Sequence, residues 1–460
     1  MSGNNSGNES RGFGTRIGYI LSMAGFCIGI GNLWKFPYMV GANGGGAFLI
    51  CYLAIALLVG VPLFLIEVQI GRSSQLSGIA GMRKLTGKKG SGWNAIGWVA
   101  LITVTVIAFY FITIIGWNMG YIVKVATGSL RGLDNAGVTQ AFVDFSGSGA
   151  CIGFTVVTVI MCWILMNTGV KAGVEKICTF AMPLLLIMLV VLAIYSNTLE
   201  GSKEGLMWYL TPDFSKITFA TIQAASVQVF YSIGVGMCCG IVYGSYIDKK
   251  ANMVADTASV AVLDTIVATL SGLVIVPALF AFGVEPTAGP SLIFITLPQM
   301  FNQMAPGVGT VFGVGFLLCV FLACITSIVG VMEAIQVNLM DITGWSRKKT
   351  NTIVTVVVFL GSLLATTSQG TGALSAVRVF GMDFFSLFDC AASAFGLTAG
   401  AVLMLAYMLC RWKFENFADE ANQGATGKLR IYPWMKAYYK FFLPIALAFI
   451  VYSIIASYFF

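Results

Sequence analysis

Two apolar segments of the chain are interrupted by closely spaced glycines, with polar side chains beside them. Residues 25–37 read GFCIGIGNLWKFP, and residues 228–237 read QVFYSIGVGM. Glycine lowers helix propensity and lets the backbone open or approach a ligand closely. An opened helix presents free N–H groups to an anion at one end and carbonyl oxygens to a cation at the other. The two segments therefore predict a binding site built on interrupted helices.

Other kinds of chemistry are excluded by what the chain lacks. Its 460 residues include no histidine, which rules out imidazole proton relays, histidine metal sites and Ser-His-Asp catalysis. The 11 cysteines show no CxxC spacing, so neither a zinc ribbon nor a disulfide framework is indicated. The longest polar loops, near 127–148 and 412–434, are too short for a catalytic domain. We therefore do not expect an enzyme.

The elements that must position the two glycine segments are membrane-spanning helices. Hydrophobic residues make up 58% of the chain and charged residues only 10%, against about 25% charged residues in soluble proteins. Apolar stretches long enough to cross a bilayer recur throughout. We predict an all-α integral membrane protein with about eleven transmembrane helices, near residues 15–38, 42–71, 93–126, 149–168, 171–196, 216–247, 255–284, 306–342, 350–367, 384–411 and 437–459.

The positive charges indicate how these helices are oriented. If the N-terminus is cytoplasmic, 20 of the 26 lysines and arginines fall on the cytoplasmic side, as the positive-inside rule requires. Residues 1–14 then form a cytoplasmic tail, and eleven spans place the C-terminus outside. This topology explains the net charge of +7 without nucleic acid as a partner. We expect a multi-pass protein of the plasma membrane, surrounded by lipid.

The two glycine interruptions occupy matching positions in the predicted order of helices. Within one transmembrane domain of residues 15–460, they fall in helices 1 and 6. These helices correspond if residues 15–196 and 216–411 form a 5+5 inverted repeat, with 437–459 as an extra helix. Paired broken helices are the best sequence indication of a transporter's central site. The alternative is that the glycines only allow close helix packing.

Seven stretches of the chain resemble a known family. They are GIGNLWKFPY (29–38), NGGGAFLICY (43–52), PLFLIEVQIGR (62–72), SVQVFYSIGVG (226–236), YGSYI (243–247), LDTIVATLSG (263–272) and ACITSIVGVME (323–333). On these motifs the chain resembles the neurotransmitter:sodium symporter family, which includes the bacterial leucine transporter. The resemblance implies that the protein couples the uptake of a small amino acid to sodium by alternating access.

The resemblance also implies two sodium sites made of oxygen ligands. The first would use the carbonyl of Cys27 and the side chains of Asn32, Ser232 and Asp264. The second would use the carbonyls of Gly25, Ile28 and Ala323 with the hydroxyls of Thr326 and Ser327. Oxygen ligands suit a hard cation. Alternatively, Thr326 and Ser327 bond to carbonyls of their own helix.

The same resemblance indicates whether chloride is required. Chloride-dependent relatives bind this ion near the positions of Tyr52, Gln228 and Ser232. The fixed carboxylate of Asp264 nearby would replace the anion. We therefore predict that chloride is not required.

The position of Gly29 indicates the class of substrate. Monoamine carriers of this family have an aspartate there, whereas a glycine resembles amino-acid carriers, whose substrate supplies its own carboxylate. Phe111 stands where a tyrosine usually meets that carboxylate. The implied substrate site consists of Phe26, Cys27, Gly29, Ile107, Phe111, Tyr231, Ser232, Gly234, Met237, Ser327 and Val331. Its largely apolar wall predicts a neutral, hydrophobic or aromatic amino acid.

Two charge pairs would close the pathway through the membrane. By resemblance, Lys35 and Asp389 form the outer gate, where the usual arginine is replaced by a lysine that lacks the bidentate fork. Arg11 and Asp341 would form the inner gate.

Two further carboxylates, Glu67 and Glu333, also lie within apolar segments. Charges at membrane depth are costly and must be paired or functional, so we expect both to bond to opened backbone.

Other functions stay open at this point. A substrate-gated channel or sensor could share the same fold, and so could a proton-coupled amino-acid carrier. The neutral oxygen ligands favour sodium over protons.

Overall fold

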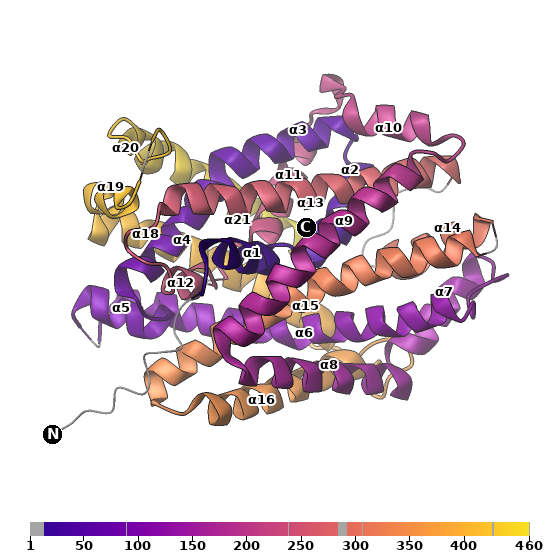
Figure 1. The fold of residues 1–460 in the computed structure, drawn as a ribbon, viewed down its shortest axis with the longest axis horizontal. Helices are drawn as coiled ribbons and strands as arrows, with labels where there is room; N and C mark the ends of the chain where they lie inside the picture. Colours follow the sequence, from indigo (N-terminus) through magenta and orange to yellow (C-terminus); the bar gives the residue numbers. More distant parts are fainter. Residues whose placement is uncertain are drawn as a thin grey trace.

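Helices form most of the part of the chain that the structure describes. The computed structural model describes residues 13–88, 90–237, 239–283, 292–305, 307–425 and 427–459. Across these ranges there is no β-strand, only an isolated bridge between Val379 and Met382. The long helices run side by side along the long axis of the molecule (Figure 1). The predicted all-α class is confirmed.

Nine of the described helices are long and apolar enough to cross a membrane. They are Gly46–Ser74, Gly92–Ala126, Gly149–Asn167, Ala172–Ser196, Met253–Ala281, Val308–Thr343, Arg347–Thr367, Phe384–Trp412 and Met435–Phe459. A tenth span consists of Arg16–Cys27 and Gly31–Ala42, which are bent by 57° at a short break. The sixth predicted span is divided between α11 (Phe219–Ile233) and α12 (Cys239–Gly244), each too short to cross alone.

Several of these spans are composite. Their main helices are α1 (Arg16–Cys27), α2 (Phe36–Ala42), α3 (Gly46–Ile55), α4 (Val61–Ser74), α6 (Ala95–Ala126), α8 (Gly149–Asn167), α9 (Lys176–Ser196), α13 (Met253–Ala281), α15 (Val308–Thr343), α16 (Arg347–Thr367), α17 (Phe384–Cys390), α18 (Thr398–Tyr407) and α21 (Leu443–Phe459). Short π-helical turns lie between some of them, including η1 (Gly31–Lys35), η4 (Val170–Glu175) and η7 (Ala391–Leu397).

Short helices also form between the spans. They are α5 (Gly78–Thr86), α7 (Asn135–Ser146), α10 (Ser202–Leu210), α14 (Leu297–Gln303) and α19 (Phe414–Asn422). The two longest predicted loops thus contain α7 and α19. Asp134 caps α7 by accepting a hydrogen bond from the N–H of Gly137 (2.7 Å), and α19 buries Phe414 and Phe417. Such helices depend on caps and one apolar face, and therefore contain no long apolar run that would indicate them in the sequence.

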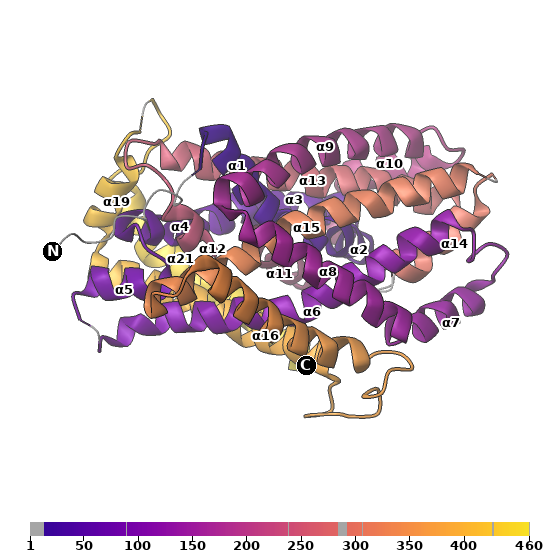
Figure 2. The ribbon, with the colours of Figure 1, turned by 60° about the horizontal axis from the view of Figure 1, so that its bottom comes forward.

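The connecting helices gather at two opposite ends of the bundle. α5, α19 and α20 (Met435–Ala437) lie at the end where the described chain begins, whereas α7, α10 and α14 lie at the other end (Figures 1 and 2). The loops at 72–89 and 412–434, both predicted to be cytoplasmic, therefore share one end. Which end faces the cytoplasm stays a prediction.

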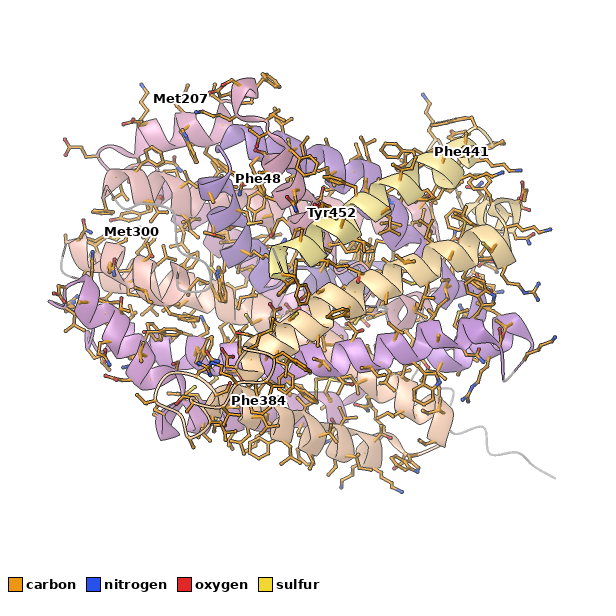
Figure 3. The ribbon with its side chains drawn as sticks, turned by 180° about the vertical axis from the view of Figure 1, so that it is seen from behind. Phe48, Met207, Met300, Phe384, Phe441 and Tyr452 are labelled. Carbon is orange, nitrogen blue, oxygen red and sulfur yellow. The ribbon has the colours of Figure 1, made fainter. Side chains whose placement is uncertain are left out.

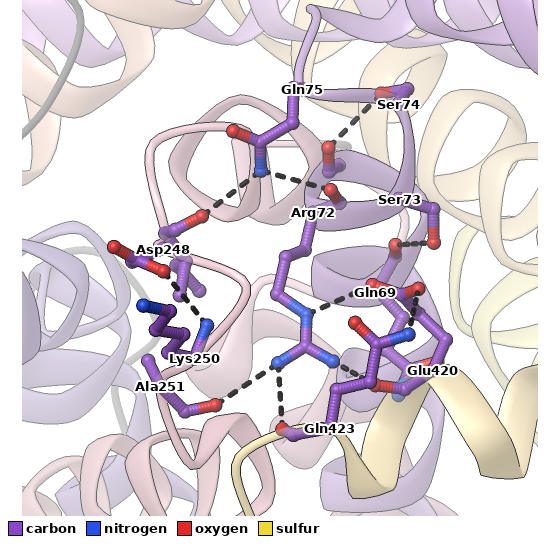
Figure 4. Close-up of polar contacts among 12 residues, drawn as sticks. Gln69, Arg72, Ser73, Ser74, Gln75, Asp248, Lys250, Ala251, Glu420 and Gln423 are labelled. Carbon is purple, nitrogen blue, oxygen red and sulfur yellow. Dashed lines mark hydrogen bonds and ion pairs between the residues drawn. The ribbon is translucent and has the colours of Figure 1, made fainter.

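Arg72, at the end of α4, is completely buried. Its Nε lies 3.2 Å from Oε1 of Glu420 on α19. The guanidinium also donates hydrogen bonds to the carbonyls of Ala251, Glu420 and Gln423 (Figure 4). A buried charge requires partners of this kind. Arg72 therefore holds α19 and the loop before α13 against α4.

Replacing Glu420 by glutamine should destabilise the fold, because Arg72 would stay buried without a counter-charge. We expect a loss of about 3 kcal/mol in the free energy of unfolding, measured as a lower melting temperature of the detergent-solubilised protein. Glu415→Gln is the matched control, since the pair between Glu415 and Lys436 (2.5 Å) is exposed and such pairs contribute little. Equal shifts in the two variants would contradict the role of Arg72.

Candidate functional site

The first helix break separates α1 from η1. Ile28 has extended torsion angles (φ −76°, ψ 97°), and the chain resumes a helical course at Gly31. Side chains from two other helices bond to the opened backbone. Ser327 of α15 donates to the carbonyl of Phe26 (2.9 Å), and Gln228 of α11 donates to the carbonyl of Gly31 (2.9 Å). The break is therefore held open from outside helix 1.

The second break follows α11. Gly234 and Gly236 have φ angles of +72° and +88°, in the region that favours glycine. A β-carbon at Gly236 would lie 2.1 Å from the carbonyl oxygen of Leu397. The buried carboxylate of Glu67 on α4 accepts hydrogen bonds from the N–H groups of Gly236 (3.1 Å) and Gly240 (2.8 Å). Glu67 thus binds opened backbone, as the sequence predicts.

A buried cluster of side-chain oxygens lies between the two breaks. Nδ2 of Asn32 donates to Oγ of Ser232 (3.0 Å) and to Oδ1 of Asp264 (2.8 Å). Oγ of Ser232 donates to Oδ2 of Asp264 (2.6 Å), and the hydroxyl of Tyr52 lies 3.0 Å from Oγ of Ser232. The three side chains predicted for the first sodium site are therefore brought together from η1, α11 and α13. Amide, hydroxyl and carboxylate oxygens form a set that fits a hard cation.

The residues predicted for the second sodium site lie where α15 packs against α1. A β-carbon at Gly25 would be 3.1 Å from Cβ of Thr326, so the helices are in close contact here. The hydroxyl of Thr326 bonds to the carbonyls of Leu322 (3.1 Å) and Ala323 (3.0 Å) in its own helix, which is the alternative considered for it. Ser327 bonds across to helix 1 instead. The hydroxyl and carbonyl oxygens of this contact also fit a hard cation.

A cavity of about 300 Å³ opens beside both breaks. Ten of the eleven predicted substrate-site residues line it, namely Phe26, Cys27, Gly29, Ile107, Phe111, Tyr231, Gly234, Met237, Ser327 and Val331. Ser232 bonds within the oxygen cluster instead. The sequence analysis missed four aromatic residues of the wall, Trp34, Tyr38, Tyr110 and Phe385. Trp34 and Tyr38 are four residues apart in the first motif, and this helical spacing is the signal that could have found them.

Comparison with known proteins identifies the family. The sequence matches the model of the sodium:neurotransmitter symporter family over residues 11–142 and 137–459. The chain belongs to this family. Its members are transporters that depend on sodium, not enzymes.

The similarity to known relatives extends over nearly the whole length of this transporter. An uncharacterised sodium-dependent transporter of Bacillus subtilis is 33% identical over 94% of this chain and 95% of its own. A sodium- and chloride-dependent creatine transporter of Oryctolagus cuniculus is 27% identical over 94% of this chain and 74% of its own. The crystal structure of MhsT in complex with L-phenylalanine matches with a TM-score of 0.84 at 31% identity, covering 96% of this chain and 99% of that one. This match confirms the predicted fold.

The predicted outer gate of the transporter contains no direct ion pair. Lys35 and Asp389 both line the cavity, but no ion pair within the described part of the chain joins them. Nζ of Lys35 lies 3.3 Å from the ring centre of Tyr231, a cation–π contact. Asp389 accepts hydrogen bonds from the hydroxyls of Tyr458 (2.7 Å) and Ser393 (3.1 Å). The two charges therefore make no direct contact in this structure, because each contacts a different neighbour, and their role as an outer gate stays a prediction.

At the opposite end of helix 1, the transporter has contacts that the sequence analysis missed. Glu175 in η4 accepts hydrogen bonds from the N–H of Gly14 (2.6 Å) and from the N–H and hydroxyl of Thr15 (both 3.1 Å). Arg16 pairs with the buried Asp256 on α13 (2.6 Å). Two carboxylates therefore anchor the start of helix 1 to neighbouring helices.

Two carboxylates at this end, Asp341 and Glu333, have partners that the sequence analysis did not predict. Arg11 of the predicted inner gate lies outside the described residues, and Asp341 accepts a hydrogen bond from the N–H of Ser77 (3.0 Å). Glu333 was expected to bond to opened backbone, but it forms an ion pair with Arg347 at the start of α16 (2.5 Å). The expectation for Glu333 is wrong because a guanidinium is within reach.

Replacing Gly236 by alanine should lower stability and ligand binding more than replacing Gly381 by alanine. Both glycines have a positive φ angle, +88° and +79°, so both variants carry about 1–2 kcal/mol of backbone strain. Only at Gly236 would the new β-carbon also meet a carbonyl oxygen, since the space around Gly381 is open. We expect Gly236→Ala to lower the melting temperature and to abolish ligand binding, while Gly381→Ala keeps binding. Equal behaviour of the two variants would argue against a tight break.

Proposed function

We propose that this protein is a sodium-coupled symporter that takes up a neutral, hydrophobic or aromatic amino acid across the plasma membrane by alternating access. One observation carries the proposal: the cavity touches both helix breaks and adjoins a buried cluster of oxygens. Gly29 connects the two, because it lines the cavity and donates its N–H to Oδ1 of Asn32 (3.3 Å). A substrate in the cavity would thus lie next to the first proposed sodium site.

Gly29 leaves the space that a substrate carboxylate would occupy. A β-carbon there would lie 3.1 Å from Oγ of Ser327 and 3.8 Å from Cζ of Phe111. Any side chain longer than that of alanine would therefore fill the part of the cavity nearest the oxygen cluster. This supports a substrate that brings its own carboxylate, which distinguishes an amino acid from a simple amine.

The remainder of the cavity suits an apolar side chain. Phe26, Ile107, Met237 and Val331 contribute hydrophobic surface to its wall. Pockets of this kind bind mainly by burial of apolar surface, with a few polar groups that fix orientation. MhsT is 31% identical to this chain, and its structure contains L-phenylalanine. This supports an aromatic or large aliphatic amino acid as the substrate of this protein.

The two proposed sodium sites share residues with the breaks. One would be held by Asn32, Ser232, Asp264 and the carbonyl of Cys27, and the other by Thr326, Ser327 and the carbonyls of Gly25, Ile28 and Ala323. Sodium would supply positive charge to the opened backbone and to the substrate carboxylate. Since the ligands come from η1, α1, α11, α13 and α15, filling the sites would draw these helices together. Two ions crossing 100 mV down a tenfold gradient would supply about 7 kcal/mol.

Closure of the proposed pathway alternates between its two ends. Lys35 and Asp389 lie on the side of the cavity that would face outward, and Asp341 lies on the side that would face the cytoplasm. Arg11 would pair with Asp341 when the inner side closes. Glu175 adds a second inner contact through the start of helix 1. In this topology the N-terminus is cytoplasmic and the C-terminus lies outside.

Sodium and amino acid should stabilise the protein cooperatively. We expect L-phenylalanine and L-leucine to raise the melting temperature only when sodium is present, and L-glutamate and L-lysine to have no effect. A ligand at 100 times its Kd should contribute about 2.7 kcal/mol. Asp264→Asn should remove most of the sodium effect, because it takes the carboxylate from the oxygen cluster. Asp248→Asn, at an exposed site, is the control.

Stabilisation that is equal in sodium and potassium, and that grows at low pH, would favour the proton-coupled carrier instead. Counterflow in proteoliposomes separates a carrier from a channel or sensor. Preloaded unlabelled L-phenylalanine should drive the uptake of labelled L-phenylalanine, and a pure sensor would show no such uptake.

Replacing chloride by gluconate should leave sodium-driven uptake unchanged. The carboxylate of Asp264 is already bonded to Ser232 and lies 3.4 Å from the hydroxyl of Tyr52, where it supplies fixed negative charge. A chloride ion there would meet like-charge repulsion. Uptake that disappears in gluconate and returns with chloride would overturn this prediction. Asp264→Asn should show the strongest response to chloride, because the fixed charge is gone.

A further inference from the structure

A chain of hydroxyl groups connects three helices beside the cavity. The hydroxyl of Tyr231 on α11 lies 2.6 Å from that of Tyr458 on α21, and Tyr458 donates to Oδ2 of Asp389 on α17 (2.7 Å). Because the proton of Tyr458 points to the carboxylate, Tyr458 accepts the hydrogen bond from Tyr231. The ammonium of Lys35 sits on the ring of Tyr231, 3.3 Å from its centre. The two charges of the outer gate are therefore connected through two tyrosines.

Tyr458 comes from the part of the chain that lies outside the two predicted repeats. α21 runs along the outer face of the bundle, with Tyr452 on its surface (Figure 3). Tyr452 is 59% exposed, whereas Tyr458 is half-buried and turned toward the gate. The helix is also held to α11 by the rings of Phe219 and Phe449, whose centres are 5.4 Å apart. Loss of the Tyr458 hydroxyl alone should therefore not detach α21.

We propose that Tyr458 is a positioning residue of the outer gate, so that the last helix takes part in closing the cavity. A lysine cannot hold a carboxylate at two points as an arginine does. In this gate the two tyrosines provide the additional connection between the lysine and the carboxylate. Tyr458 fixes the carboxylate of Asp389, and Tyr231 lines the cavity while its ring contacts the ammonium of Lys35. The inference rests on the proposed function for the identity of the ligand and for the side of the cavity that faces outward.

The test compares two tyrosines of the same helix. Tyr458→Phe removes the hydroxyl but keeps the ring, and Tyr452→Phe removes a hydroxyl from the exposed face as a matched control. Cys27 lines the cavity, so its labelling by a membrane-impermeant thiol reagent, applied to whole cells and read by mass spectrometry, reports opening of the outer gate. We expect Tyr458→Phe to accelerate this labelling about tenfold, the effect of losing a hydrogen bond to a charged group. Tyr452→Phe should leave the rate unchanged.

Transport kinetics give an independent measurement. Tyr458→Phe should raise the KM for L-phenylalanine about tenfold and keep the maximal rate within about twofold, because the substrate escapes before the gate closes. A general loss of folded transporter would lower the maximal rate instead. That outcome, together with faster labelling of all buried cysteines, would overturn the proposal.

A double-variant cycle tests whether Tyr458 acts through Asp389. If it does, adding Tyr458→Phe to Asp389→Asn should not accelerate the labelling of Cys27 any further. Fully additive effects would overturn the proposal, as would equal labelling rates in the Tyr458→Phe and Tyr452→Phe variants. If the unmodified protein binds none of the tested amino acids, the proposed function fails. The labelling comparison would still decide the role of Tyr458.

Discussion

Backbone groups at the depth of a membrane must find hydrogen-bond partners inside the protein, because lipid offers none. Both helix breaks meet this requirement with side chains from other helices. Glu67 on α4 bonds to the N–H groups of Gly236 and Gly240, and Ser327 on α15 bonds to the carbonyl of Phe26. Neither break is therefore stabilised by its own helix alone. Each break depends on the assembled bundle for its hydrogen-bond partners, and the cavity lies beside the two breaks.

The same requirement explains why polar side chains concentrate between the breaks. Asn32, Ser232 and Asp264 satisfy one another in a fully buried cluster, and Ser327 both bonds to helix 1 and lines the cavity. A cation bound among these groups would exchange protein hydrogen bonds for ion–oxygen contacts. Ion binding would then change the conformation of the opened backbone that also lines the proposed substrate site. This shared use of a few oxygens gives a physical basis for coupling sodium to substrate.

Away from the cavity, buried charges are paired between different helices. Arg72 on α4 is held by Glu420 on α19, and Glu333 on α15 by Arg347 on α16. Between Lys35 and Asp389, the proposed outer gate, an aromatic ring and a chain of hydroxyl groups take the place of a direct pair. These contacts give the outermost parts of the chain, α19 and α21, a structural connection to the helices that carry the site.

Composition and local pattern determined the membrane class, the positions of both breaks and the family, because these depend on residues that are neighbours along the chain. The family resemblance also located ten residues of the cavity wall. Only the tertiary structure decided which partner each buried polar group takes. Asp389 bonds to Tyr458, 69 residues away, although Lys35 also lines the cavity. Which donor a carboxylate binds depends on how distant helices pack, because several donors can lie at similar distances from it. The sequence does not contain these distances.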